Sequence, residues 1–132
     1  MNGYIENIEE QTLGNESFRK VVYTGKHSQL VLMSLKPGEE IGEEIHGDGD
    51  QFFRIDRGEG TIMIDDTETP VSDGFAVVVP AGAKHNVKNT SATEPLKFYT
   101  IYSPPHHRDG VEHSTRDQAE SDDEHFDGIK TE

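Results

Sequence analysis

Glu44 and His46 stand two residues apart in the stretch GEEIH, immediately before the glycine-rich loop GDGD. If this stretch is a strand, the two side chains point to the same face, because side chains alternate along a strand. A carboxylate and an imidazole that converge on one point are the beginning of a metal site. The chain has no cysteine, so any metal ion must be held by nitrogen and oxygen ligands.

The elements that must position these residues are short strands. Apolar runs rich in Val, Ile, Thr, Phe and Tyr recur between glycine and proline turn signals, and no segment keeps a helical apolar period. One short helical turn is expected within residues 4–15, and DDTETP is expected to be a hairpin connection. Roughly eight to ten strands at this spacing predict an antiparallel sandwich or barrel. The predicted strands are residues 17–24, 28–35, 42–46, 51–56, 61–65, 75–80, 85–89 and 96–102.

The stretch GFAVVVPAGAKHNVKN resembles the second motif of the cupins, a family of small jelly-roll barrels. That motif is G-x5-P-x-G-x2-H-x3-N, and Gly74, Pro80, Gly82, His85 and Asn89 stand at its fixed positions. The motif also makes physical sense, because Pro80 and Gly82 favour a tight turn that aims His85 inward.

The first cupin motif, G-x5-H-x-H-x3,4-E-x6-G, is matched in spacing from Gly38 to Gly58. Glu44 stands where the family usually has its first histidine, and Gln51 stands where it usually has glutamate. The resemblance therefore implies a metal held by Glu44, His46, Gln51 and His85. Such nitrogen and oxygen donors suit Fe(II) or Mn(II), with Zn(II) or Ni(II) as alternatives. Gln51 is expected to be a weak ligand or to bond a metal-bound water.

Period-two alternation predicts the residues around this centre. If Gln51 faces inward, Phe53 and Ile55 follow it, and His85 likewise brings Val87 inward. On the last strand, either the set containing Phe98, Thr100 and Tyr102 or the set containing Lys97, Tyr99 and Ile101 faces inward. We favour the second set, with Tyr99 as a hydrogen-bond donor to a substrate. The expected pocket is lined by Phe53, Ile55, Val87 and Tyr99, or else these side chains simply fill the interior.

The segment SPPHHRDGVEHS, residues 103–114, contains His106, His107 and Arg108, which could bind an anion or carry protons. It is either a lid over the barrel mouth, with Arg108 meeting a carboxylate or phosphate, or an exposed extension. The following residues, 115–132, are acidic and lack apolar periodicity, so we expect a disordered tail.

The composition limits the partners. The chain of 132 residues has a formal net charge of −14, which repels nucleic acid and anionic membranes. No apolar run approaches the roughly 18 residues of a membrane span, and no basic-then-apolar signal-peptide pattern opens the chain. We therefore expect a cytoplasmic protein. Its acidity is either ordinary surface charge or an adaptation to high salt.

The expected architecture is an all-β, single-domain cupin jelly-roll barrel of antiparallel strands over residues 1–114, with the acidic tail beyond it. Pairing of edge strands predicts a homodimer, for which an outward-facing Phe52 is a contact candidate. The resemblance implies a metal-dependent enzyme acting on a small organic molecule by dioxygenase, isomerase or lyase chemistry. The alternatives are a non-catalytic module that binds a sugar-like ligand, and a structural barrel.

Overall fold

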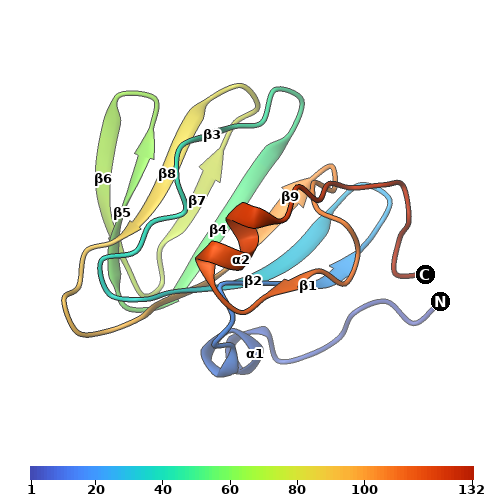
Figure 1. Cartoon of the computed structure of the whole chain (residues 1–132), viewed down its shortest axis with the longest axis horizontal. Coiled ribbons are helices and arrows are strands. Elements are labelled where there is room, and N and C mark those ends of the chain that lie inside the picture. Colours follow the sequence, from blue (N-terminus) through green and yellow to red (C-terminus); the bar gives the residue numbers. More distant parts are fainter.

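Two antiparallel sheets face each other in the computed structural model, which describes residues 1–132 (Figure 1). The first sheet has six strands in the order β10-β1-β2-β9-β4-β7, and the second has four in the order β3-β8-β5-β6. The sheets are not joined by hydrogen bonds into the closed barrel that the sequence predicts. The strands are β1 (Arg19–Thr24), β2 (Gln29–Leu35), β3 (Glu44–Ile45), β4 (Asp50–Arg57), β5 (Glu59–Ile64), β6 (Thr67–Ser72), β7 (Ala76–Val79), β8 (Lys84–Asn89), β9 (Leu96–Ser103) and β10 (Glu112–His113).

Every apolar run that predicted a strand overlaps one, but two strands lie outside those runs. β6 occupies most of the expected hairpin connection; its first four residues are exposed, so it lacks an alternating apolar pattern. Pro70 is tolerated there because β6 is an edge strand, paired only with β5. β10 has two residues and is too short to leave a periodic signal.

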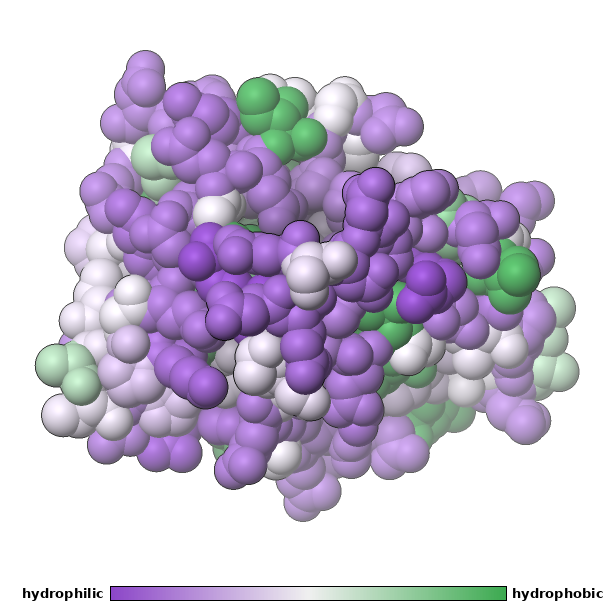
Figure 2. Space-filling view, viewed as in Figure 1, coloured by the Kyte–Doolittle hydropathy of each residue, from purple (hydrophilic) through white to green (hydrophobic).

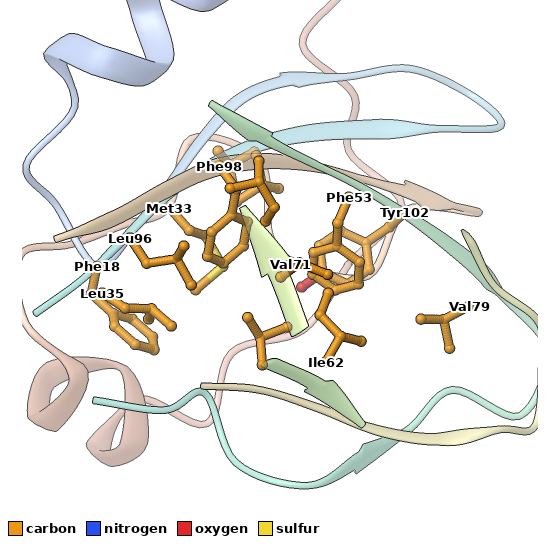
Figure 3. Packing of buried hydrophobic residues seen from close by; sticks show 14 of the residues in the cluster. Phe18, Met33, Leu35, Phe53, Ile62, Val71, Val79, Leu96, Phe98 and Tyr102 are labelled. Atoms are coloured by element: carbon orange, nitrogen blue, oxygen red, sulfur yellow. The ribbon is translucent and has the colours of Figure 1, made fainter. Parts of the chain in front are cut away.

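The core fills the space between the sheets, where Phe53 and Phe98 of the first sheet face Ile62 and Val71 of the second (Figure 3). Phe53 and Phe98 are fully buried, with ring centroids 5.7 Å apart. Burial of such side chains stabilises the fold by roughly 1.5–3 kcal/mol each. As expected, the Gln51 row of β4 faces this core.

The preference for Lys97, Tyr99 and Ile101 as the inward set of the last strand is wrong. Phe98, Thr100 and Tyr102 face the interior. Lys97 is also buried, but its Nζ donates to the carbonyl of Asn15, which follows α1 (Ile8–Gly14). Because α1 covers β9 from outside, both faces of β9 carry buried residues, and period-two alternation could not tell them apart.

The C-terminal residues differ from the disordered tail that the composition predicts. Thr115 caps α2 (Arg116–Ser121) by accepting from the N–H of Gln118. Beyond α2, the buried carboxylate of Glu124 contacts His107, and the N–H of Phe126 donates to the carbonyl of His106. The acidic residues here are held by specific partners, which a count of charges cannot reveal.

Neither α1 nor α2 is long and apolar enough to cross a membrane.

Candidate metal centre

Glu44, His46 and His106 bring three ligand atoms within 4.8 Å of one another. Glu44 begins β3, His46 follows it, and His106 comes from the segment after β9. The turn of the second motif holds this arrangement: Gly82 adopts a φ of +88° and its N–H donates to the carbonyl of His46 at 2.8 Å. A side chain at position 82 would be strained in that conformation, which explains the glycine.

His46 and Glu44 lie in close contact without forming a hydrogen bond. His46 Nε2 lies 3.0 Å from Glu44 Oε2. This nitrogen is nevertheless fully buried without a hydrogen-bond partner, so the two atoms are close but not aligned for donation. An imidazole nitrogen and a carboxylate oxygen this close together can bind the same divalent ion. Such an ion would also give the buried nitrogen a partner, and a buried polar atom without a partner costs free energy.

His85 and Gln51 lie beside this cluster. His85 is directly opposite Glu44 in the β3–β8 pairing, and its ring centroid is 5.1 Å from that of His46. His85 Nε2 lies 3.0 Å from Gln51 Oε1, while Gln51 Nε2 donates to Thr100 Oγ1 at 2.9 Å. The amide is thereby oriented with its oxygen toward the imidazoles. Of the four residues that the motifs predict, Glu44 and His46 belong to the cluster together with His106, whereas His85 and Gln51 lie beside it.

The protonation states suit metal binding, which needs neutral imidazoles and an ionised carboxylate. Burial raises the pKa of Glu44, but the contact with His46 and the nearby charge of Arg19 outweigh it, so the pKa is lowered overall. Burial lowers the pKa of His85. Burial, together with the neighbouring His107 and His46, lowers the pKa of His106 to about 4, although part of that ring is exposed.

His106 was predicted to belong either to a lid or to an exposed extension, and the structure places it within the cluster. Its segment is held by Gln29, a fully buried side chain of β2 whose Oε1 accepts from the N–H groups of His106 and His107. Gln29 Nε2 donates to the carbonyl of His107 at 2.8 Å. Sequence reasoning missed Gln29, because a glutamine at the start of a strand has no motif that marks it.

The other two predicted lid residues lie away from the cluster. His107 is buried, with Nε2 at 3.2 Å from the Tyr102 hydroxyl and Nδ1 at 2.5 Å from Glu124 Oε1. Arg108 is exposed, and its guanidinium lies 4.0 Å from Asp122. Arg108 therefore does not reach the opening where a ligand carboxylate was expected to meet it.

A cavity of about 250 Å³ opens beside His46 and His106 and gives access to the cluster. Its walls come from the loop of residues 47–50, from Tyr102 and from Pro104 and Pro105. Of the predicted pocket residues, Phe53, Ile55 and Val87 are fully buried in the core instead, which supports the alternative that they fill the interior. Tyr99 is half-buried on the outer face, with its ring 6.1 Å from that of Phe52; proposing it as a substrate donor was wrong.

Comparison with known proteins agrees with the motifs. The sequence profile of the family described as "Cupin domain" matches residues 31–102. Protein L612 of Acanthamoeba polyphaga mimivirus is 46% identical over 110 residues, and YrkC of Bacillus subtilis is 46% identical over 122 residues. These matches cover 81% and 88% of this chain, which spans 69% and 65% of the length of those relatives. The crystal structure of BH2720 from Bacillus halodurans is 41% identical, with a TM-score of 0.88 over 90% of this chain and 94% of that one.

Proposed function

The chain belongs to the cupin family, and we propose that it binds a divalent metal ion through Glu44, His46 and His106. The observation that carries this proposal is the buried Nε2 of His46, which lacks a hydrogen bond and lies 3.0 Å from a carboxylate oxygen. Two imidazoles and one carboxylate match the ligand types of non-haem iron sites. Fe(II) and Mn(II) suit this donor set best, with Zn(II) or Ni(II) as alternatives.

His85 and Gln51 complete the site in one of two ways. If the ion lies toward β8, His85 Nε2 and Gln51 Oε1 become further ligands, because these atoms are 3.0 Å apart and face the same region. If it lies toward His106, they orient a water molecule at the ion instead. In both cases Thr100 fixes the amide so that its oxygen faces the site.

We further propose that the protein is an enzyme acting on a small organic molecule. A bound divalent ion would supply a Lewis acid with open positions for substrate oxygens, as isomerase, lyase or dioxygenase chemistry requires. The chain provides the enclosure: the cavity beside His46 admits a small molecule, and buried Tyr102 shields the inner side of the centre. The competing proposal, a non-catalytic module for a sugar-like ligand, shares the cavity and needs no turnover.

Metal titration of the purified protein tests the first proposal. We expect one Mn(II) per chain by calorimetry and elemental analysis. His46→Ala should weaken binding by more than about 10-fold, since even outer-shell changes commonly cost that much. His27→Ala removes an exposed histidine near the β1–β2 turn and should leave affinity unchanged. Absence of stoichiometric metal under any loading condition, or equal affinity in both variants, would contradict the proposal.

A further inference from the structure

Arg19 is a buried cation that forms no ion pair, although its charge acts on the nearby carboxylates of Glu44 and Glu124 and lowers their pKa values. It belongs to the inward-facing row of β1, beside the core residue Val21, and only 7% of it is exposed. Its Nε is fully buried without a hydrogen-bond partner. No ion pair of the protein involves Arg19. Because a buried charge costs free energy unless it is paired, an anionic group in direct contact with the guanidinium would stabilise it.

Two other cations of the protein, buried Lys97 and half-buried Arg116, show what such a partner looks like. Lys97 is buried, and its Nζ donates to the carbonyl of Asn15. Arg116 lies 2.9 Å from a carboxylate oxygen of Glu120. Arg19 instead has the ring of Phe18 in contact, with its centroid 5.4 Å from the guanidinium carbon. A single cation–π contact is weaker than a bidentate carboxylate, which is the usual partner of an enclosed guanidinium.

Arg19 lines a second cavity, of about 230 Å³, which lies beneath α2 and is open to solvent. In Figure 1, α2 crosses in front of the first sheet, and its Arg116 donates to the carbonyl of Ile41 in the segment before β3. This cavity shares no lining residue with the one beside His46 and His106. Glu44 lines the cavity beneath α2, so the candidate metal centre lies between the two cavities.

Each carboxylate around the cavity beneath α2 lies closer to a histidine or to Arg116 than to Arg19. Oxygens of Glu44 and Asp122 lie 3.0 Å from His46 and His113, respectively. Glu124 is 2.5 Å from His107, and Glu120 is paired with Arg116. These negative charges disfavour a dianion such as phosphate, but Arg19 still lacks a partner. A singly charged ligand of small size fits both conditions.

We propose that the cavity beneath α2 binds the carboxylate of a small organic acid, with Arg19 as its counter-ion. The rest of such a ligand would extend toward Glu44, on the metal side of the cavity. Small organic acids would then be the substrates of the proposed enzyme. Their turnover rests on the proposed function, whereas their binding to Arg19 does not. Arg19 is not one of the candidate metal ligands, so carboxylate binding can be measured in the metal-free protein.

Titration of the full-length, metal-free protein with propionate, followed by amide NMR, tests the proposal. We expect saturable shifts at residues lining the cavity beneath α2, including Ala119. Propionamide has the same shape without the charge and should produce no such shifts. Saturable binding of both compounds, or of neither, would overturn the proposal.

Two variants assign the binding to Arg19. Arg19→Met keeps much of the apolar stem and should weaken propionate binding by at least about 10-fold, the loss of a charge-assisted contact. Arg57→Met makes the same change in net charge at an exposed residue paired with Glu94, and should bind like the parent protein. Equal affinity in the Arg19→Met and Arg57→Met proteins would refute the role of Arg19. Should Arg19→Met fail to fold, Arg19→Gln removes the charge but keeps a polar side chain, and undiminished propionate binding by that protein would equally refute the proposal.

Repeating the titration with the zinc-loaded protein separates the two proposals. Propionate binding without any metal binding contradicts only the metal centre. Metal binding at His46 without propionate binding contradicts only the carboxylate site.

Discussion

Between β3 and β10 the gap between the two sheets is covered by α2 and the segment that follows it, whereas the gap between β6 and β7 has no such cover. The covered side is predominantly hydrophilic, as Figure 2 shows for this face of the molecule. Its cavity is lined mainly by charged residues and by His107. The uncovered side has an apolar cavity of about 260 Å³, lined by Ile62, Ile64 and Val71 from the second sheet and by Phe75 and Val78 near the edge of the first.

The polar and the apolar gap between the sheets are shielded from solvent in different ways. On the covered side, the buried histidines need hydrogen-bond partners, and residues 115–132 of the same chain supply carboxylates for them. On the uncovered side, Phe75 and Val78 remain 46% and 65% exposed, beside the unpaired edge of β7. An uncharged edge is where two copies of a chain with net charge −14 can meet with least repulsion. The homodimer stays a prediction, and we expect its contact at this edge.

The largest expected effect concerns Glu124 on the covered side. Glu124→Ala leaves buried His107 and the N–H of Arg108 without their partner, and should lower the free energy of unfolding by about 2–3 kcal/mol. Glu120→Ala removes an exposed partner of Arg116 from the same cover and should cost no more than about 0.5 kcal/mol. Urea unfolding measures both. Similar losses of stability in the two variants would show that α2 and the following segment are not held in place mainly by the contact between Glu124 and His107.

Acid should weaken the same side. Burial raises the pKa of Glu124, but the contacts with His107 and with the N–H of Arg108 outweigh it and lower the pKa from 4.5 to about 2. The stabilisation from the ionised carboxylate is therefore complete above pH 4.5 and is lost as the pH falls toward 2. Burial also lowers the pKa of His107 from 6.5, so the advantage of its neutral form is complete above pH 6.5 and fades below it, with the same sign.

Urea midpoints at several pH values measure this dependence. The midpoint of the parent protein should fall as the solution is acidified, and that of Glu124→Gln should fall less, because its amide does not titrate. Parallel curves for the two proteins would contradict the assignment to Glu124.

The smallest effect on stability is expected on the uncovered side. Val78→Asp places a charge on the exposed edge and should weaken self-association by at least about 10-fold in sedimentation experiments, since the charge would be buried without a partner. The monomer should lose little stability, because Val78 is mostly exposed. Phe52→Ala is the comparison: its ring packs on Tyr99 of the same sheet, so association should be unchanged. Loss of association in the Phe52 variant alone would move the interface to that face.

Much of the site was predictable, because the spacing of the two motifs predicts which of their residues point inward. Glu44 and His46 share a face by alternation, and Pro80 and Gly82 aim the turn before His85 whatever the rest of the chain does. His106 was harder to assign, because its position depends on Gln29, 77 residues earlier, and on the C-terminal segment. Arg19 was missed, although its alternation with Val21 placed it inward. A lone arginine in a strand predicts no ligand until it is seen to lack a partner.

The sequence by itself determined the strands with apolar runs and the two motifs, though not β6 and β10, because apolar runs and motifs depend on local backbone preferences and period-two patterns. Tertiary structure alone decided which face of β9 is internal, since α1 buries its other face as well. It also decided that the acidic C-terminal residues fold back over one side of the sandwich, because their carboxylates find partners there that lie far away along the chain. Electrostatic pairing depends on distance in space, and composition records only how many charges there are.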